Sequence, residues 1–304
     1  MSGQAVALCL CSVAVGYLVG QRRRQKSRKG GPGPLVVANP TSSCSGVCIV
    51  TGGSRGIGAA ICKALANQYK IACVYRSNKA AADFVVRTVQ QLGGVCAAFQ
   101  CDVGNPSDVA AMFDAVDAAF ADSPLVALVN NAAIIGPGGK DGKLLGLPPL
   151  DGDGFENELW KVLRPNVLGP LACTRLALER MSPKLSGKGT GGQIVNISSG
   201  AAYIQGAPLL YMISKGALNS LQCGIVQECA LHSVRINSIS PGMCDTDMPS
   251  AKAKEMTKAS IPMKRLGQAS EIADTVKYLL SENSSYVCGA NIRVAGGRPM
   301  GSIQ

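Results

Sequence analysis

Histidine is almost absent from this chain: His232 is the single histidine in 304 residues, and no two of the 13 cysteines are separated by two residues. The sequence therefore argues against a zinc site. The cysteine number is odd and the cysteines are scattered through apolar runs, which is not the pattern of a disulfide framework. We expect them to be small core residues of a domain in a reducing compartment, with no metal site.

Aromatic residues are also scarce, at 4% of the chain, although the formal net charge is +11. Six of the positive charges stand in one run between Arg22 and Lys29, which leaves +5 of the +11 for the remainder. No aromatic side chains alternate with these cations, as they would on a surface that stacks nucleic-acid bases. A nucleic-acid partner is therefore not expected.

An uncharged, mostly apolar run spans residues 5–20, directly before the cationic stretch. As a helix it would reach about 24 Å, somewhat short of a hydrocarbon core of roughly 30 Å. Because the charges follow the run, a cleaved secretory signal is disfavoured. We expect residues 1–21 to be a hydrophobic membrane anchor or a targeting segment, with a disordered tail as the third option. Residues 22–45, rich in basic residues, Gly, Pro and Ser, are expected to be a linker.

Such an anchor would also determine where the protein resides. The positive-inside rule places the residues that follow it in the cytosol. The expected localisation is therefore membrane-anchored, at the endoplasmic reticulum or the outer mitochondrial membrane, with the folded domain facing the cytosol. An organelle-targeted or cytosolic protein is the alternative.

Short apolar runs alternate with helix-length segments throughout residues 46–304, and nothing marks a second domain. This alternation predicts a single α/β domain with a doubly wound, parallel, seven-stranded Rossmann-type sheet. Ligands of such folds bind at the carboxyl ends of the strands. The predicted strands are 47–51, 71–75, 95–101, 125–130, 193–198, 234–239 and 291–294, and the predicted helices are 57–68, 79–92, 106–120, 155–181, 209–231 and 270–280.

A glycine-rich turn joins the first predicted strand to the first predicted helix, with the pattern Thr-Gly-x-x-x-Gly-x-Gly. Glycines let the backbone approach a ligand closely, and the helix that they open presents unpaired N–H groups to a phosphate. A dinucleotide is the natural ligand, although a turn of this kind can also occur without one. The residues expected to contact the cofactor here are Thr51, Gly52, Ser54, Arg55, Gly56, Ile57 and Gly58.

The second predicted strand ends without the acidic residue that normally holds the adenosine ribose hydroxyls of NAD(H). Arg76 follows it instead, and Arg55 in the glycine turn can reach the same place. Two guanidiniums that converge favour a doubly charged 2′-phosphate, so NADP(H) is predicted. Two solvated surface arginines are the alternative. Asp102 is placed to accept from the adenine amino group, and Asn131 with Ala132 to line the adenosine, although the asparagine could be a strand-end cap.

Tyr211 and Lys215 begin a helix-like segment, and their separation places both side chains on one helix face. Lowering a tyrosine pKa from near 10 by about 3 units needs roughly 4 kcal/mol. The Lys215 ammonium is expected to supply part of this by favouring the phenolate. Ser199 ends the preceding strand, where its hydroxyl can hold a carbonyl or alcohol oxygen.

In this order along the chain, the motifs resemble those of the short-chain dehydrogenase/reductase family. The resemblance covers about residues 46–297. Within the family, the sequence is most similar to the branch that contains ketoacyl-carrier-protein reductases and carbonyl reductases. The motifs that carry it are Thr51 to Gly58, Asp102-Val103, Asn130 to Ala133, Asn166, Ile197 to Ser199, Tyr211 to Lys215, and Pro241-Gly242 with Thr246.

The resemblance implies an NADPH-dependent oxidoreductase that reduces a carbonyl to an alcohol by hydride transfer. Tyr211 would be the general acid and Ser199 would orient the carbonyl. Lys215 would bind the nicotinamide ribose, and Asn166 would hold a water in a proton relay. The resemblance also implies a small carbonyl or alcohol substrate and a homo-oligomer. Its further cofactor contacts would be Arg55, Arg76, Asp102, Val103, Asn131, Ala132, Pro241, Gly242 and Thr246.

Some features leave alternatives open. Ser198 could be the active hydroxyl, because the segment from Ser199 to Tyr211 is one residue shorter than is common in the family. Ala133 replaces the usual glycine and adds a methyl group near the cofactor. Residues 243–266 are expected to form a lid. The alternative functions are a membrane-associated NAD(P)-dependent alcohol or steroid dehydrogenase and a non-catalytic NADP(H)-binding protein.

Overall fold

The computed structural model describes residues 46–136, 144–150, 153–204 and 207–298. The anchor and linker predicted for residues 1–45 therefore lie outside the described residues, and so do residues 299–304 at the end of the predicted domain.

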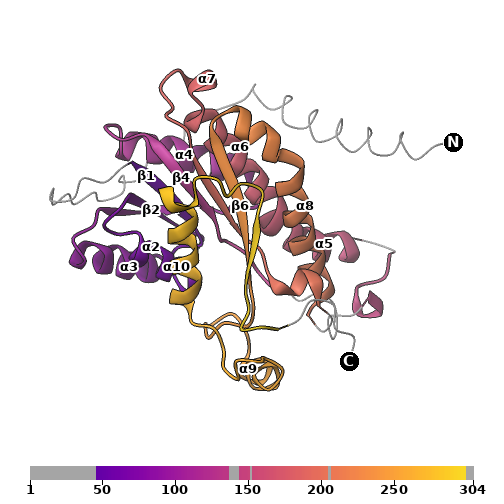
Figure 1. Cartoon of the computed structure of the whole chain (residues 1–304). Coiled ribbons are helices and arrows are strands. Elements are labelled where there is room, and N and C mark those ends of the chain that lie inside the picture. Colours follow the sequence, from indigo (N-terminus) through magenta and orange to yellow (C-terminus); the bar gives the residue numbers. More distant parts are fainter. Residues whose placement is uncertain (1–45, 137–143, 151–152, 205–206, 299–304) are drawn as a thin grey trace. The chain divides into compact units, whose positions relative to one another are not determined.

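A parallel sheet of seven strands forms the centre of the domain, in the order β3-β2-β1-β4-β5-β6-β7 (Figure 1). Strand order reverses between β1 and β4, which is the switch point of a doubly wound fold. The predicted Rossmann-type fold is confirmed. The strands are β1 (Val47–Thr51), β2 (Lys70–Tyr75), β3 (Cys96–Gln100), β4 (Leu125–Asn130), β5 (Gly192–Ile197), β6 (Val234–Pro241) and β7 (Asn291–Val294).

Helices cover both faces of the sheet, as right-handed crossovers between parallel strands require. On one face lie α2 (Gly56–Ala64), α3 (Lys79–Gln91) and α10 (Ala269–Leu279). On the other face lie α4 (Pro106–Ala119), α6 (Gly169–Met181) and α8 (Leu209–Leu231). The remaining elements are η2 (Leu144–Gly146), α5 (Gly154–Leu163), η3 (Arg164–Leu168), α7 (Pro183–Ser186), η4 (Gly200–Tyr203), α9 (Ala251–Lys258) and η5 (Glu282–Ser284).

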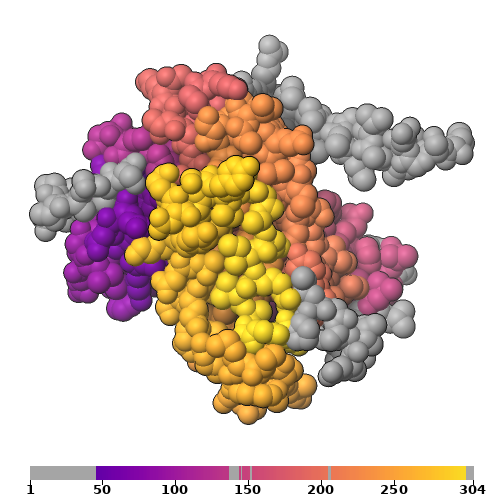
Figure 2. Space-filling model, viewed as in Figure 1, coloured from indigo at the N-terminus to yellow at the C-terminus, as the bar shows by residue number. Residues whose placement is uncertain are grey.

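Each face of the sheet has its own apolar core. Ile61, Leu65 and Ile272 pack on the side of α2, α3 and α10, while Phe113, Met181 and Ile236 pack on the other side. Strands buried on both faces are continuously apolar rather than alternating, which is why the runs were recognisable in the sequence. Figure 2 shows the face on which α10 and β7 lie, in yellow, and α9 protrudes at the bottom of this view.

The segment predicted as one helix over residues 155–181 is interrupted. α5 passes into the π-helical turn η3, which then passes into α6. Pro165 and Pro170 lie in the first turn of η3 and of α6 respectively. A proline inside a helix removes a backbone donor and displaces the turn before it, and the wider turn accommodates this.

Candidate active site

The candidate active site lies at the carboxyl ends of β1, β4, β5 and β6. In Figure 1 this end of the sheet faces the bottom of the view, where α9 follows β6, whereas α7, which precedes β5, lies at the opposite end. The glycine turn after β1, the residues after β4, the serines after β5 and the start of α8 all meet there. The sheet thus brings together segments that are more than 150 residues apart in the chain.

The glycine turn fits only glycine at its critical positions. Gly52 and Gly56 have φ angles of 64° and 53°, a left-handed conformation that favours glycine. A Cβ atom on Gly58 would lie 2.2 Å from the carbonyl oxygen of Gly52, and one on Gly52 would lie 2.9 Å from the Cα of Ala132. The turn is therefore packed against itself and against the residues after β4 too closely for a side chain at these two positions.

Thr51 and Asn131 hold this turn in place. The Thr51 hydroxyl accepts hydrogen bonds from the backbone N–H groups of Asn131 and Ala132, at 3.0 and 3.1 Å. The Asn131 side chain donates to the carbonyl oxygens of Thr51 and Gly52, at 2.9 and 3.1 Å. Both residues were predicted to contact the cofactor, and the structure shows them bracing the backbone that would do so.

The first turn of α2 is suited to an anion. Its N-cap, Arg55, provides no side-chain cap, and the first turn contains no acidic residue that would oppose an anion. Arg55 and Arg76 are both exposed, and among the described residues neither forms an ion pair. The residues therefore fit a phosphorylated dinucleotide: a glycine turn, a helix N-terminus without a side-chain cap and two exposed guanidiniums.

Asp102 and Val103 follow β3 next to this region. One carboxylate oxygen of Asp102 accepts a hydrogen bond from the Gly104 N–H at 2.9 Å, which shapes the turn. Val103 is buried and packs in the core, and a Cβ atom on Gly169 would lie 2.8 Å from its carbonyl oxygen. Asp102 is thus partly engaged in its own turn and half-buried beside the expected adenine site.

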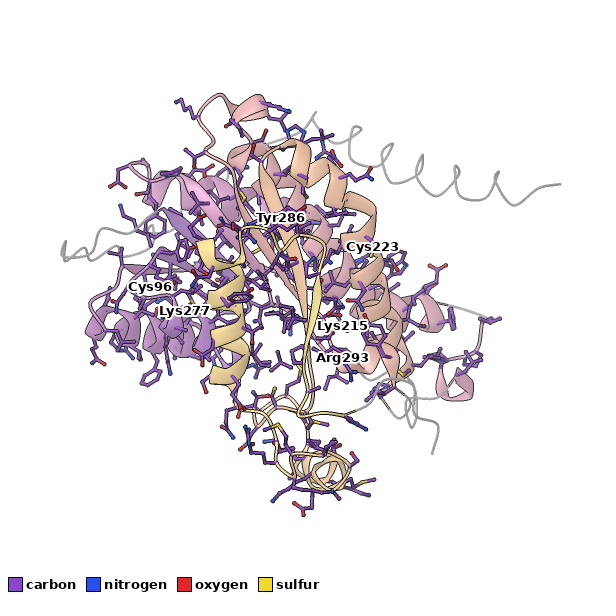
Figure 3. The ribbon with its side chains drawn as sticks, in the orientation of Figure 1. Cys96, Lys215, Cys223, Lys277, Tyr286 and Arg293 are labelled. Atoms are coloured by element: carbon purple, nitrogen blue, oxygen red, sulfur yellow. The ribbon has the colours of Figure 1, made fainter. Side chains whose placement is uncertain are left out.

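The predicted Tyr211 and Lys215 come together on α8. The ammonium nitrogen of Lys215 lies 5.7 Å from the centroid of the Tyr211 ring. Lys215 is 2% exposed and donates to the Ile197 carbonyl oxygen, at the end of β5, at 2.7 Å. Figure 3 labels Lys215 on α8 beside the sheet. The backbone of one strand therefore fixes the direction of the amine.

Burial governs the protonation of both groups. It raises the pKa of the Tyr211 phenol, and the hydrogen bond with the Ser199 side chain works in the opposite direction. Burial also lowers the pKa of Lys215 to about 8. The net shift of the phenol is opposite to the one expected from the sequence, because desolvation penalises the phenolate more than its neighbours favour it. A protonated phenol at neutral pH is the form that can donate a proton.

Ser198 and Ser199 have different surroundings. The Ser198 hydroxyl is buried and donates to the Lys215 carbonyl oxygen at 3.3 Å. The Ser199 hydroxyl accepts from the Ala201 N–H at 3.0 Å, caps η4 and contacts the Tyr211 phenol. Of the two, Ser199 faces the phenol, which favours it as the residue that orients a substrate oxygen.

Asn166 lies in the π-helical turn η3 and is completely buried. Its side chain accepts from the Ile134 N–H at 2.9 Å and donates to the Ile134 carbonyl at 2.8 Å and to the Ser214 hydroxyl at 3.0 Å. Ser214 in turn donates to the Tyr211 carbonyl at 2.8 Å. The side chain therefore joins the segment after β4 to α8, and its part in a water relay stays a prediction.

The segment after β6 approaches the glycine turn. Pro241 ends β6, and the Gly242 N–H donates to the Val294 carbonyl of β7 at 2.9 Å. Thr246 lies next to Gly56, since a Cβ atom on Gly56 would be 3.6 Å from the Thr246 side chain. α9 begins five residues after Thr246, within the segment predicted as a lid, and Met248, Met256 and Met263 expose between 48% and 70% of their surface.

Sequence reasoning missed several residues that support the site. Ser214 and the carbonyl of Ile197 bond to the Tyr211 backbone and to the Lys215 side chain of α8, and Tyr203, Asn219 and Asn291 form a hydrogen-bond network beside this helix. Their partners are distant in the chain, so no local pattern marks them. Pro165 inside a helical segment was the available signal for the wide turn that carries Asn166.

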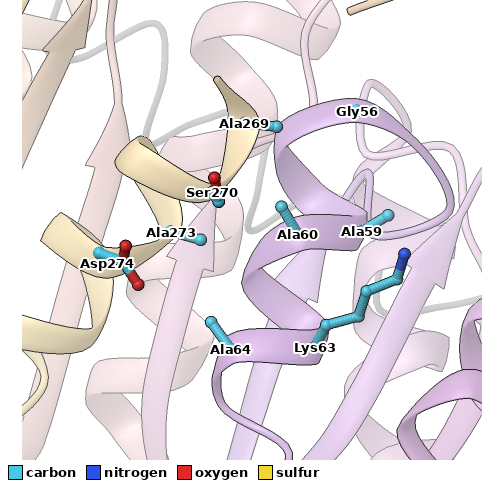
Figure 4. A pocket seen from close by; sticks show the side chains of 9 residues that line it. All are labelled: Gly56, Ala59, Ala60, Lys63, Ala64, Ala269, Ser270, Ala273 and Asp274. Carbon is cyan, nitrogen blue, oxygen red and sulfur yellow. The ribbon is translucent and has the colours of Figure 1, made fainter. Parts of the chain in front are cut away.

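A separate groove of about 540 Å³ runs between α2 and α10 (Figure 4). Alanines make up most of its wall, and neither Tyr211 nor Ser199 borders it, so it is not the catalytic cleft. Its lining residues are Gly56, Ala59, Ala60, Lys63, Ala64, Ala269, Ser270, Ala273 and Asp274.

Comparison with known proteins agrees with this geometry. Residues 52–298 match the family described as enoyl-(acyl carrier protein) reductase. The chain is 38% identical over 261 residues to the uncharacterized oxidoreductase YgfF of Escherichia coli, covering 83% of this chain and 99% of the relative. It is 32% identical over 254 residues to a 3-oxoacyl-[acyl-carrier-protein] reductase of Rattus norvegicus, covering 83% and 97%.

A solved structure shows the same fold. A short chain dehydrogenase from Burkholderia cenocepacia in complex with NADP superposes with a TM-score of 0.74 at 28% identity, covering 85% of this chain and 99% of that one. The fold, the glycine turn and the matches over most of the chain define a nicotinamide-dependent oxidoreductase. The chain belongs to the short-chain dehydrogenase/reductase family.

The predicted membrane-anchored localisation is wrong. In residues 46–298, with their gaps, no helix is both long enough and apolar enough to cross a bilayer. The Escherichia coli relative is matched over 99% of its length, which leaves it no separate segment that could correspond to an anchor. The apolar run from which the prediction came, residues 5–20, lies outside the described residues.

Proposed function

We propose that this protein is an NADPH-dependent carbonyl reductase with Tyr211 as its general acid. The observation that carries the proposal is that the Tyr211 phenol interacts with the Ser199 side chain, while its ring centroid lies 5.7 Å from the buried amine of Lys215. The carbonyl oxygen of a substrate placed against Ser199 and Tyr211 could accept a proton from the phenol as negative charge develops on it. A 3-oxoacyl reductase among the relatives supports a carbonyl substrate.

The residues of the glycine turn would bind the cofactor. The first-turn amides of α2 would hold its pyrophosphate, and Arg55 and Arg76 its 2′-phosphate. Lys215, fixed by the Ile197 carbonyl, would hold the nicotinamide ribose. When bound, NADPH supplies the hydride for the carbonyl carbon. The NADP-bound relative supports this preference over NAD(H).

The proton that Tyr211 donates must be replaced before the next cycle. Lys215 lies on the same helix face, and with a pKa of about 8 it exchanges protons readily near neutral pH. Its Nζ is therefore suited to reprotonate the phenol, directly or through the ribose hydroxyl that it would hold.

A homo-oligomer is also proposed. Exposed apolar side chains gather on α5, η3, α6 and α8, which supports an association surface there. They are Trp160, Leu168, Leu171 and Ile213, each between 36% and 47% exposed.

The test is consumption of NADPH with small ketones, quinones and ketoacyl thioesters. Tyr211→Phe should lower turnover by about a hundredfold or more while NADPH binding remains. Tyr286→Phe, which alters a fully exposed tyrosine outside the site, is the matched control and should retain turnover. Full activity of Tyr211→Phe would exclude the mechanism.

A further inference from the structure

A tyrosine that the proposed chemistry does not use lies close to the site. Tyr203 ends η4, four residues after Ser199. Its phenol oxygen accepts one hydrogen bond from the Asn219 side chain of α8 at 2.8 Å and a second from the Asn291 side chain of β7 at 2.9 Å. One oxygen thus joins three elements.

The network closes on itself. The Asn291 amide also donates to the Asn219 carbonyl oxygen at 3.1 Å, and its own carbonyl oxygen accepts from the Ser240 hydroxyl at 2.8 Å. Ser240 is completely buried, while Tyr203 and Asn219 are half-buried. Every polar group of the two asparagines has a partner, so the arrangement is geometrically specific.

Each arm of the network leads to a different part of the site. Tyr203 fixes η4, whose first residue follows Ser199. Asn219 lies four residues after Lys215 and eight after Tyr211, on the same face of α8. Ser240 directly precedes Pro241 and Gly242 at the end of β6. In Figure 3, the labels of Lys215 and Arg293 mark α8 and β7, the two elements that Tyr203 joins to η4.

We propose that Tyr203, Asn219 and Asn291 form a positioning network that holds the Ser199 turn in register with Tyr211 on α8. This inference rests on the proposed function. The network touches neither Tyr211 nor Lys215 through a side-chain hydrogen bond, so it acts through the placement of η4 against α8. Loss of its central acceptor lets η4 shift, and a shift of the order of 1 Å at a reacting group is costly.

The test uses the whole chain and Tyr203→Phe, which keeps the ring and removes the acceptor. The kcat for NADPH oxidation should fall about tenfold to a hundredfold, while the Kd for NADPH stays unchanged. Asn219→Leu should give the same result. Asn219→Asp, whose carboxylate can accept from the Tyr203 hydroxyl, should retain most of the activity.

A matched structural control separates positioning from general stability. The Ser238 hydroxyl donates to the Gln222 side chain, a buried bond between β6 and α8 that does not involve η4. Ser238→Ala should lower the melting temperature with kcat unchanged. Equal losses of kcat in Ser238→Ala and Tyr203→Phe, or unchanged kcat in Tyr203→Phe, would overturn the inference. No NADPH turnover by the wild-type protein would instead refute the proposed function.

Discussion

The Lys215 ammonium lies 5.7 Å from the Tyr211 ring centroid, one helical turn away; the amine is buried and the tyrosine is half-buried. Burial favours the neutral form of each: the phenol keeps its proton and the amine loses its own more easily. Desolvation, rather than a strong ion pair, therefore determines the favoured protonation state of the two groups. If Tyr211 is the general acid of a reduction, as proposed above, this leaves a proton on the group that would donate it.

The buried amine should make stability depend on pH. Its pKa is about 8 when folded and 10.5 when exposed, so the unfolded chain binds more protons between these values. The destabilisation is fully present below pH 8 and disappears as the pH rises toward 10.5. It amounts to about 3 kcal/mol, reduced by the hydrogen bond to Ile197.

Lys215→Met should therefore raise the free energy of unfolding near pH 7, although it abolishes turnover. The gain should shrink steadily above pH 8. Urea denaturation at several pH values, without cofactor, measures this. A stability difference that does not change with pH would show that burial does not favour the neutral form of this amine.

Cofactor selection should depend on the two exposed arginines. Arg76→Ala and Arg55→Ala should each weaken NADPH binding by about tenfold to a hundredfold, since a charge-assisted hydrogen bond to a phosphate contributes about 1.5–3 kcal/mol. NADH, which has no 2′-phosphate, should bind as before. Titration calorimetry with both cofactors measures the ratio. Arg87→Ala on α3, also exposed, is the control, and an equal loss there would indicate a general charge effect.

Substitution of the two adjacent serines should have different effects on kcat/KM. Ser199→Ala should lower kcat/KM by about a hundredfold, because it removes the hydroxyl beside the phenol. Ser198→Ala should cost only about 1 kcal/mol of stability, since its hydroxyl bonds the Lys215 carbonyl. Steady-state kinetics and thermal unfolding of both variants decide between them. The reverse order would make Ser198 the active hydroxyl.

The glycine turn should tolerate no side chain at its inner position. Gly58→Ala would place a Cβ atom 2.2 Å from the Gly52 carbonyl oxygen, so the turn must open, and NADPH binding should be lost. Gly224→Ala on α8 meets nothing within 4 Å and should stabilise the protein by about 0.5–1 kcal/mol. Normal cofactor affinity in Gly58→Ala would mean that the turn does not cradle the ligand.

The architecture could be predicted because its signals are local. Strands such as Val47–Thr51 and Leu125–Asn130 are short, apolar and bounded by turn residues, and the order of strands and helices leaves few topologies. The break at η3 was not predicted, because an apolar helical period continues through Pro165 and Pro170 while the wide turn absorbs them.

Several side chains that meet at the strand ends could be named from the sequence, but the contacts that they make could not. Asn131 and Thr51 brace the turn across 80 residues of chain, which no local pattern reports. The direction of the Tyr211 pKa shift depends on how much water the fold excludes, and that is a tertiary property. The spacing of Tyr211 and Lys215 indicated which groups meet, but not which of their forms is favoured.

The wide turn at η3 has a mechanical consequence. Each residue of an α-helix rotates the chain by about 100°. One additional residue in the turn therefore changes which side chains of α5 lie on the same face as the buried side chains of α6. α6 buries Cys173, Ala177 and Met181 against the sheet, while the helical period of α5 is offset from that of α6 by the wide turn. Substitutions on the exposed side of α5 should therefore need no compensating substitutions in the core beneath α6.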